Sequence, residues 1–282
     1  MNERVKKKQH YVWRNYLKPW IKDNKIWCRM GNRIFQTSPV NIGNETYFYK
    51  VNELNDFEKK MITYTIKKFP IENWSTLLNA FTRYNFYGKY SDESQKNGLE
   101  NYHNFIENNF VPILNKLYKK DLSFFYDNDM KAKFSYFLGL QNFRTKKMLK
   151  NPQKIFDVIQ TPDEYKGKFN PENIIKIYGL LFAECMGNWI HSKGKIYFFE
   201  SEYDLIVSDQ PIINIRADYS LTAPKRVEYY YPLTTNLAIF ITDKILTDRI
   251  LKKEDAIFFN NQMYKKSHEQ IYSKTQELLL SL

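Results

Sequence analysis

Residues 195–242 read KIYFFESEYDLIVSDQPIINIRADYSLTAPKRVEYYYPLTTNLAIFIT, and this stretch decides the fold class. It contains short runs of β-branched and aromatic residues separated by turn-forming residues, a pattern typical of strands. The runs are residues 195–199, 204–207, 212–215, 227–231 and 237–242. Their close spacing predicts hairpins or a meander of antiparallel strands rather than βαβ units.

The residues before this stretch have a helical pattern. Apolar residues recur at three- and four-residue intervals from Leu54 to Phe69, and Pro70 ends that run. Another helix is predicted to begin at Asn170-Pro171, an N-cap residue followed by a proline in the first turn. Between the two, helices are predicted over residues 72–86, 100–119 and 129–149, with a kink or break at Pro112.

The two ends of the chain complete the prediction. Gly31-Asn32 separates residues 26–30 from residues 33–36, as in a β-hairpin, and a long final helix is predicted over residues 255–280. The fold class is therefore α+β, with a predominantly helical middle, a small antiparallel sheet from the N-terminal hairpin and the 195–242 strands, and a long C-terminal helix. We expect one domain over residues 1–282, because the most loop-like stretch, residues 90–98 (YSDESQKNG), is short.

The bulk composition excludes several classes of protein. Hydrophobic residues make up 43% of the chain, which excludes wholesale disorder. No stretch approaches the ~18 uncharged apolar residues that span a bilayer, so we expect a cytoplasmic protein without membrane contact. Cys28 and Cys185 lack partner motifs and are expected to be reduced. No cofactor is predicted, since glycine-rich phosphate loops and metal-ligand spacings are both missing.

The net charge of +12 makes nucleic acid the expected partner, because surfaces that follow phosphates need Lys and Arg. The basic residues are 34 Lys and only 9 Arg, accompanied by many Asn, Ile, Tyr and Phe. A/T-rich codons supply the same combination, so genomic bias is the alternative explanation of the charge. A protein partner or a homo-oligomer is left open.

The helix around Gln141 carries the sharpest local anomaly. Gln141 falls at helical spacing among Phe134, Phe137 and Leu138, so it is expected to point inward, and Arg144 borders the same face. A buried Gln and Arg each require a partner such as a carboxylate or a phosphate. The two interpretations are a structural ion pair and a catalytic site.

A second candidate follows an apolar strand. Ser208 and Asp209 precede Gln210-Pro211, a sequence that suits a turn in which Asp209 caps its own backbone. The functional interpretation makes Asp209 a general base, or a ligand of a divalent metal, that accepts from Arg144 in a cleft. Ser208 is expected to bind substrate beside it.

Histidines supply two more candidates. His10 and Tyr11 precede Arg14, so we expect Tyr11 and Arg14 to bind a phosphate-containing substrate while His10 transfers a proton, as in metal-free RNA cleavage. The basic residues Arg4 and Lys6-Lys7-Lys8 also fit a solvated basic tail. Asn261 and His268 share an apolar stripe of the predicted last helix and are the remaining substrate-binding candidates, although a histidine on such a stripe is more often a satisfied core residue.

Several of these residues stand in blocks with a recognisable order. The blocks are HYVWRNYL (residues 10–17), QNFRT (141–145), VSDQP (207–211), YPL (231–233) and Asn261. They resemble an uncharacterised, mostly bacterial family of unknown function, whose members carry His-Tyr-Val-Pro-x-x-Tyr-Leu, Gln-x-x-Arg-Thr and Thr-Ser-Asp-Asn-Pro. Trp13 departs from that pattern, where the family usually has proline. The resemblance implies that His10, Gln141, Arg144 and Asp209 converge in one pocket.

Three functions are consistent with these residues. The first is a nuclease, acting on RNA rather than DNA, of the kind found among bacterial defence effectors and toxins. In it Arg144 would neutralise phosphate charge, Gln141 would orient the substrate, and His10 or Asp209 would move the proton. The second is a nucleic-acid-binding module without catalysis, and the third is a structural or protein-interaction protein in which every inward polar residue is a satisfied core contact.

Overall fold

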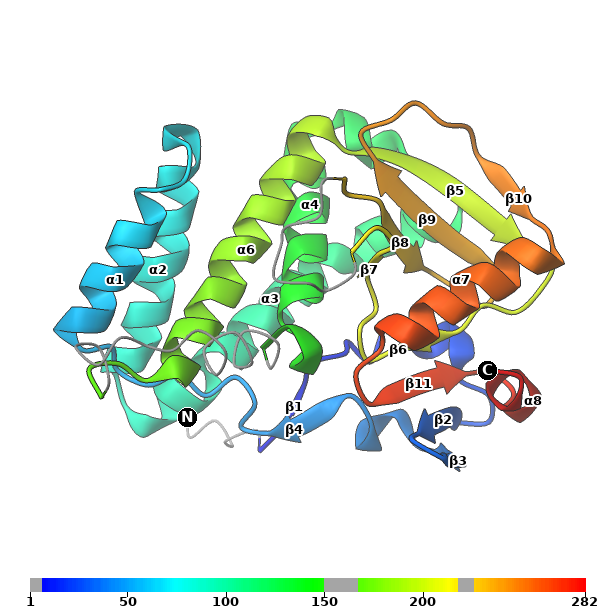
Figure 1. Ribbon diagram of the computed structural model, residues 1–282, viewed down its shortest axis with the longest axis horizontal. Helices are drawn as coiled ribbons and strands as arrows, with labels where there is room; N and C mark the ends of the chain where they lie inside the picture. The colour runs from blue at the N-terminus through cyan, green and yellow to red at the C-terminus, as the bar shows by residue number, and fades with distance from the viewer. Residues whose placement is uncertain (1–6, 150–166, 218–225) are drawn as a thin grey trace.

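The computed structural model describes residues 7–149, 167–217 and 226–282. Long helices occupy the left and middle of Figure 1, a five-stranded sheet lies to the right, and the N- and C-terminal strands lie below. The helices are α1 (Asp56–Ile66), α2 (Trp74–Lys89), α3 (Asp92–Tyr118), α4 (Asn128–Phe143), α6 (Pro171–Lys193), α7 (Lys253–Lys266) and α8 (Gln276–Leu280). The predicted helical middle and the α+β class are confirmed.

The strands form three sheets. They are β1 (Lys8–His10), β2 (Ile26–Met30), β3 (Arg33–Thr37), β4 (Asn44–Thr46), β5 (Lys195–Ser201), β6 (Val207–Ser208), β7 (Ile213–Asn214), β8 (Tyr229–Pro232), β9 (Leu237–Thr242), β10 (Arg249–Leu251) and β11 (Gln270–Ser273). The strand orders are β1-β4, β10-β5-β9-β8-β7 and β3-β2-β11-β6. The antiparallel pairing of β7, β8, β9 and β5 confirms the predicted meander, whereas β10 joins β5 in parallel.

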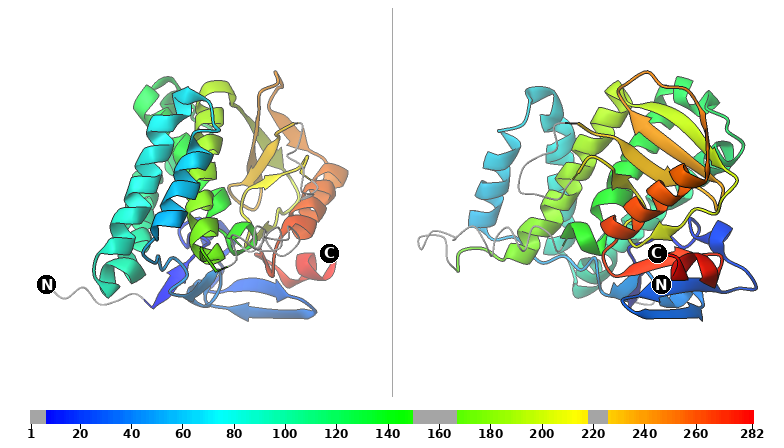
Figure 2. Two further views of the ribbon diagram at one scale, coloured as in Figure 1. Left: turned by 60° about the vertical axis from the view of Figure 1, so that its left-hand side comes forward. Right: turned by 45° about the vertical axis from the view of Figure 1, so that its right-hand side comes forward.

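Helices α4 and α6 approach each other unusually closely because glycines lie where they meet. A Cβ added to Gly139 would stand 2.1 Å from the carbonyl oxygen of Ala183, and one added to Gly187 would stand 3.2 Å from the Cα of Tyr136. Helix α6 begins where the sequence predicts, with the Asn170 side chain accepting from the backbone of the first turn. Helices α1 and α2 lie on the outer side of α6 (Figure 2).

Strand β9 separates two hydrophobic cores, because its successive side chains point to opposite faces of the sheet. Leu237, Ile239 and Ile241 pack with the residues of the long helices. Ala238 and Phe240 pack on the other face, against Phe259 and its neighbours in α7. All residues of β9 are therefore buried, and the sheet is covered on both faces.

The N- and C-terminal parts of the chain share one sheet. Strand β11 pairs with β2 on one side and with β6 on the other, so the end of the chain lies between its beginning and the 195–242 stretch (Figure 1). Strands β2 and β3 form the predicted hairpin, with Met30 opposite Arg33 across the Gly31-Asn32 turn. Gly31 has a φ of +58°, which a glycine adopts without strain.

The predicted C-terminal helix is wrong in length and continuity. Helix α7 ends at Lys266, and residues Gln270–Ser273 form a strand instead. The apolar residues of this strand are buried between β2 and β6, so tertiary pairing overrides the helical spacing of residues 255–280. The prediction of a single small sheet is wrong for the same reason, because β11 draws the N-terminal hairpin into a sheet separate from most of the 195–242 strands.

The prediction of a loop at residues 90–98 is also wrong. Its polar residues start α3: the Ser91 side chain caps the helix by accepting from the backbone of Ser94, and acidic residues follow in the first turn. Gly98 lies inside the helix, where a Cβ would collide with the ring of Tyr87. Helix α3 continues through Pro112, so this proline does not end it.

Candidate functional site

A cleft of about 600 Å³ opens between the N-terminal segment and α3. We call it the His10 cleft. Its N-terminal wall carries the basic groups Lys8, His10, Arg14 and Lys18, and its α3 wall carries Glu100, Asn104, Glu107 and Asn108. Cationic side chains therefore face carboxylates and amides across one open space. Arg4 and Lys6, from the predicted basic segment, lie outside the described residues.

His10 lies at the end of β1, which pairs with β4, so a short two-stranded sheet holds it at the cleft. Burial, together with the positive charges of Arg14, Lys8 and Arg144, lowers the pKa of His10 to about 4, although a backbone hydrogen bond at Val40 opposes the shift. The imidazole is therefore neutral at pH 7 and can accept a proton.

Two polar atoms at the walls of this cleft are unsatisfied. Nε2 of His10 and Nδ2 of Asn104 are both shielded from solvent and have no hydrogen-bond partner among the described residues. An unsatisfied buried polar atom costs about 1–3 kcal/mol, and at a cleft wall a ligand or a water can supply its partner. Their presence at a cleft wall is the main structural reason to regard the His10 cleft as a binding site.

Arg144 lies directly behind the α3 wall of the cleft. It is the C-cap residue of α4, and its Nη2 donates to Oε1 of Glu107 at 2.5 Å and to Oε1 of Gln141 at 2.8 Å. Burial lowers the pKa of Arg144, but the carboxylate of Glu107 outweighs it, so the pKa is raised and the guanidinium stays charged. The inward direction of Gln141 and the need of Arg144 for a carboxylate are confirmed.

The partner of Arg144 is nevertheless not the predicted one. Asp209 is fully buried and accepts from the backbone nitrogens of His268, Glu269 and Gln270 at 2.8, 2.8 and 3.0 Å. Burial raises the pKa of Asp209, and these three donors lower it without cancelling the rise. Both carboxylate oxygens are engaged by the backbone that leads into β11, so Asp209 neither caps its own backbone, as the turn interpretation predicts, nor offers a free base or an open metal ligand.

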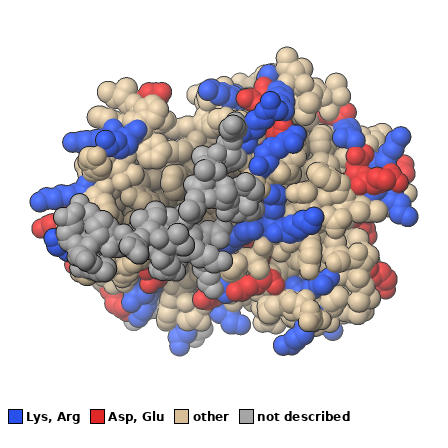
Figure 3. Space-filling view, viewed as in Figure 1, with Lys and Arg blue, Asp and Glu red and all other residues tan. Residues whose placement is uncertain are grey.

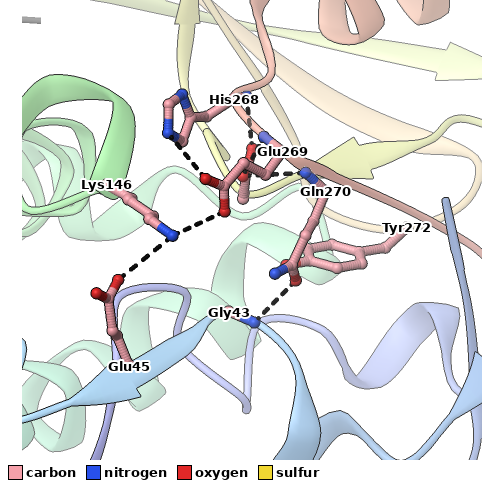
Figure 4. A network of polar contacts seen from close by, with 8 residues as sticks. Gly43, Glu45, Lys146, His268, Glu269, Gln270 and Tyr272 are labelled. Carbon is pink, nitrogen blue, oxygen red and sulfur yellow. Dashed lines mark hydrogen bonds and ion pairs between the residues drawn. The ribbon is translucent and has the colours of Figure 1, made fainter. Parts of the chain in front are cut away.

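His268 and Glu269, whose backbone nitrogens bond to Asp209, belong to a network of charged side chains (Figure 4). Nζ of Lys146 is 2.8 Å from Oε2 of Glu269 and 3.4 Å from Oε2 of Glu45, and Nε2 of His268 is 3.4 Å from Oε1 of Glu269. The side chain of Gln270 accepts from the backbone of Gly43 at 3.1 Å. His268 therefore lies at the turn into β11, not on a helix and not in the His10 cleft.

Ser208 and its neighbours form hydrogen bonds within the protein interior and do not line the His10 cleft. The Ser208 hydroxyl donates to the carbonyl oxygen of Gln210 at 3.1 Å, and the Gln210 side chain donates to the carbonyl oxygens of Asn142 and Ile212. Thr145 in turn donates to the Gln210 side chain. The QNFRT and VSDQP blocks are thus bonded to each other in the interior.

Asn261 does not lie on the buried face of α7, whereas the residue before it does. The buried amide is Asn260, which accepts from the backbone nitrogen of Ile206 at 3.0 Å and donates to the carbonyl oxygen of Asp204 at 2.9 Å. Asn261 is only half-buried, and Ile257, one turn before it on the same side of the helix, is 50% exposed. The predicted stripe combined residues of α7 with residues that come after α7 has ended.

Tyr11 links the two groups of predicted residues. Its carbonyl oxygen accepts from Nε2 of Gln141 at 3.4 Å, whereas burial and the charge of Asp209 raise the pKa of its phenol. Its side chain is 1% exposed and does not line the His10 cleft. Of the predicted site residues, only His10 and Arg14 line the His10 cleft. Gln141 and Arg144 lie behind its α3 wall, and Ser208, Asp209, Asn261 and His268 do not line it.

The acidic and amide residues of α3 were not among the site residues predicted from the sequence. Glu100, His103, Glu107 and Phe110 recur at intervals of three, four and three residues, and all four are buried. The reasoning that placed Gln141 inside applies equally to this pattern. It would have identified Glu107 as the buried carboxylate that Arg144 requires.

Surface charge by itself does not locate the site. On the face seen in Figure 3, Lys and Arg gather near the upper middle and centre, with Asp and Glu interspersed and along the right-hand and lower edges. Within the described ranges, no group of three or more His, Cys, Asp or Glu is arranged to hold a metal ion. No helix in the described part of the chain combines the length and apolarity needed to cross a bilayer.

Comparisons with known proteins identify a family but no activity. Residues 8–277 match the model of the family described as "Protein of unknown function (DUF4238)". No curated protein and no solved structure matches the chain. The match covers nearly the whole chain, including the His10 cleft and the Asp209 turn, and the protein is therefore a member of the DUF4238 family.

Proposed function

We propose that the protein is a nuclease that cleaves RNA rather than DNA in the His10 cleft. The observation that carries this proposal is the unpartnered Nε2 of a neutral His10 in the same cleft as the cations of Lys8, Arg14 and Lys18. A proton acceptor beside a cluster of cations is what cleavage of a phosphodiester by its own 2′-hydroxyl requires.

In the proposed reaction, Nε2 of His10 takes the proton of the 2′-hydroxyl as the 2′-oxygen bonds to phosphorus. The bond from phosphorus to the 5′-oxygen then breaks, and water in the open cleft protonates the leaving oxygen. DNA lacks the 2′-hydroxyl, so this route selects RNA. A phosphate bound by Arg14 and Lys8 would neutralise the charges that lower the pKa of His10, and would bring that pKa nearer to the working pH.

The roles of Gln141 and Arg144 are positioning roles in this proposal. Their side chains lie behind the cleft wall, where Arg144 holds Glu107 and Gln141 holds Arg144. Lys8, Arg14 and Lys18 are exposed and are the residues that reach phosphate. A cytoplasmic location and a role as a bacterial defence effector or toxin complete the proposal.

The test compares wild type with His10→Asn on a mixed-sequence RNA and on DNA of the same sequence, with EDTA present. His191→Asn is the matched control, because that histidine lies near the end of α6 and bonds to Asn128. We expect wild type and the control to cleave only RNA, and His10→Asn to lose about 10²–10⁴-fold in rate while its thermal melting is unchanged. Equal rates for wild type and a folded His10→Asn would refute the assignment of His10.

A second candidate is nucleic-acid binding without cleavage. It is favoured by the shielding of His10 Nε2 from solvent, because a general base must reach the proton that it removes. In that case wild type leaves RNA intact but binds it with an affinity that falls steeply with salt, and His10→Asn binds as tightly as wild type.

A further inference from the structure

A second cavity lies next to the His10 cleft. This cavity has a volume of about 460 Å³ and is lined by Asn15, Lys18, Pro19, Val111, Leu114, Asn115 and Tyr118. We call it the Asn115 pocket. Asn15 and Lys18 line both spaces, so the two are neighbours between the N-terminal segment and α3, and we call them together the groove.

Helix α3 forms one wall along the whole groove. Its lining residues recur every one to four positions from Glu100 to Tyr118, on one side of the helix. At 1.5 Å per residue this side extends over about 27 Å. A stacked single strand advances about 3.4 Å per nucleotide, so the groove is long enough for several nucleotides of an extended polymer.

The chemistry of the groove changes along its length. Among the described residues, the charged groups that line the groove all belong to the His10 cleft, and only Lys18, at the junction, is shared with the Asn115 pocket. The pocket itself combines apolar walls from Val111 and Leu114 with the ring of Tyr118 and the amide of Asn115. A pocket whose lining combines apolar side chains, an aromatic ring and amides suits a flat, uncharged heterocycle, because the ring can stack and an amide can both donate and accept.

We infer that the Asn115 pocket is a nucleobase subsite, which binds one base of a single-stranded polynucleotide whose phosphates lie in the His10 cleft. The inference deepens the proposed nuclease function and rests on it for the nature of the polymer. Lys18 contacts the phosphate that joins the nucleotide in the pocket to the next one in the cleft. Asn115 reads the edge of the base, and Tyr118 stacks on its face.

The experiment measures binding separately from cleavage. The probe is a fluorescent 2′-O-methyl RNA, which lacks the attacking hydroxyl, together with a series of the same oligonucleotide in which one position at a time is abasic. Fluorescence anisotropy is measured for wild type, Asn115→Ala and Asn109→Ala. Asn115 and Asn109 are both exposed residues of α3, but Asn109 lines neither cavity, so it is a matched control.

We expect Asn115→Ala to weaken binding of the intact probe about tenfold, and Asn109→Ala to leave it unchanged. One abasic position should weaken binding to wild type by a similar factor and should have no further effect on Asn115→Ala, because both changes remove the same contact. Equal affinities of the three proteins, full additivity at every abasic position, or no binding at all would overturn the inference.

These outcomes separate the subsite from the nuclease. Position-dependent loss of binding, together with uncut RNA, would support the pocket and refute the catalytic proposal. Cleavage that depends on His10, together with equal binding by Asn115→Ala and Asn109→Ala, would support the nuclease and refute the pocket.

Discussion

Arg144 and Glu107 form a buried ion pair that joins the C-terminal end of α4 to the middle of α3. Nη2 of Arg144 is 2.5 Å from Oε1 of Glu107, and the two side chains are 3% and 11% exposed. The positive end of the pair belongs to the C-cap residue of α4, and the dipole at a helix C-terminus favours a cation there. The negative end contributes to the wall of the His10 cleft, so the pair sets the shape of the proposed site without touching substrate through Arg144.

Arg144→Ala should destabilise the protein by about 3–5 kcal/mol, because it leaves the carboxylate of Glu107 buried without its cation. Chemical denaturation in urea measures this loss. Arg14→Ala, which removes an exposed arginine from the same cleft, should change stability by no more than about 0.5 kcal/mol. Equal losses for the two variants would show that the pair is not energetically important.

Asp209→Ala should destabilise the protein by about 3–5 kcal/mol, since three backbone N–H groups, that of Gln270 buried and the other two half-buried, lose a charged acceptor. Asp209→Asn should lose less, because its amide oxygen still accepts. Hydrogen exchange should accelerate at the amides of β11, which begins at this turn. Asp204→Ala, at an exposed position earlier in the same segment, is the control. Unchanged stability of Asp209→Ala with lost activity would instead favour a catalytic role.

Gly139→Ala should destabilise the protein by about 1–3 kcal/mol despite the better helix propensity of alanine, because the new methyl group would overlap the carbonyl oxygen of Ala183. Gly179→Ala is the control on the opposing helix. Its methyl group would meet a flexible Leu149 side chain at 3.2 Å and should be nearly neutral. Thermal unfolding measures both, and equal melting temperatures would contradict the close approach of α4 and α6.

The stability of the protein should fall as the pH drops below about 6.5, and His103→Phe should reduce this fall. Burial, with Arg144 and Arg83, holds the pKa of His103 well below its usual value, and the pKa of His10 is about 4. Both histidines then bind protons in the unfolded chain at a pH where the folded protein excludes them, so acid favours unfolding.

The measurement is urea denaturation of wild type and His103→Phe at pH 8 and at pH 5. Phenylalanine keeps the ring that packs against Tyr49, whose centroid is 4.2 Å from that of His103. Relative to wild type, the variant should gain about 2 kcal/mol between the two pH values, from ~1.4 kcal/mol per pH unit. Parallel curves for the two proteins would exclude His103 as a source of acid lability.

Local sequence signals located most elements but not their ends or partners. Gly31-Asn32 forms its hairpin and Asn170 caps its helix, because both depend only on neighbouring residues. Residues 255–280 have helical spacing throughout, yet Ile271 and Tyr272 lie in a strand. Their hydrogen bonds go to β2 and β6, which are distant in sequence, so no local pattern contained this information.

The candidate site shows the same difference between local signals, which the sequence reveals, and contacts between distant segments, which it does not. Burial of Gln141 and Arg144 was predictable from the face of one helix, and so was the burial of Glu107 on another. Arg144 pairs with Glu107 rather than Asp209 because of the way α3, α4 and β11 pack. Both oxygens of Asp209 already accept from backbone nitrogens at the start of β11.

The sequence by itself determined the α+β class, the hairpin, the start of α6 and the inward direction of Gln141 and Arg144, because hydrophobic periodicity and capping act over a few residues. Only the tertiary structure decided which buried charges pair, that Asp209 anchors β11, and that His10, Arg14 and Glu107 face one another across a cleft. These relationships join segments far apart in the chain, and their free energies depend on burial and mutual distance, which exist only once the chain has folded.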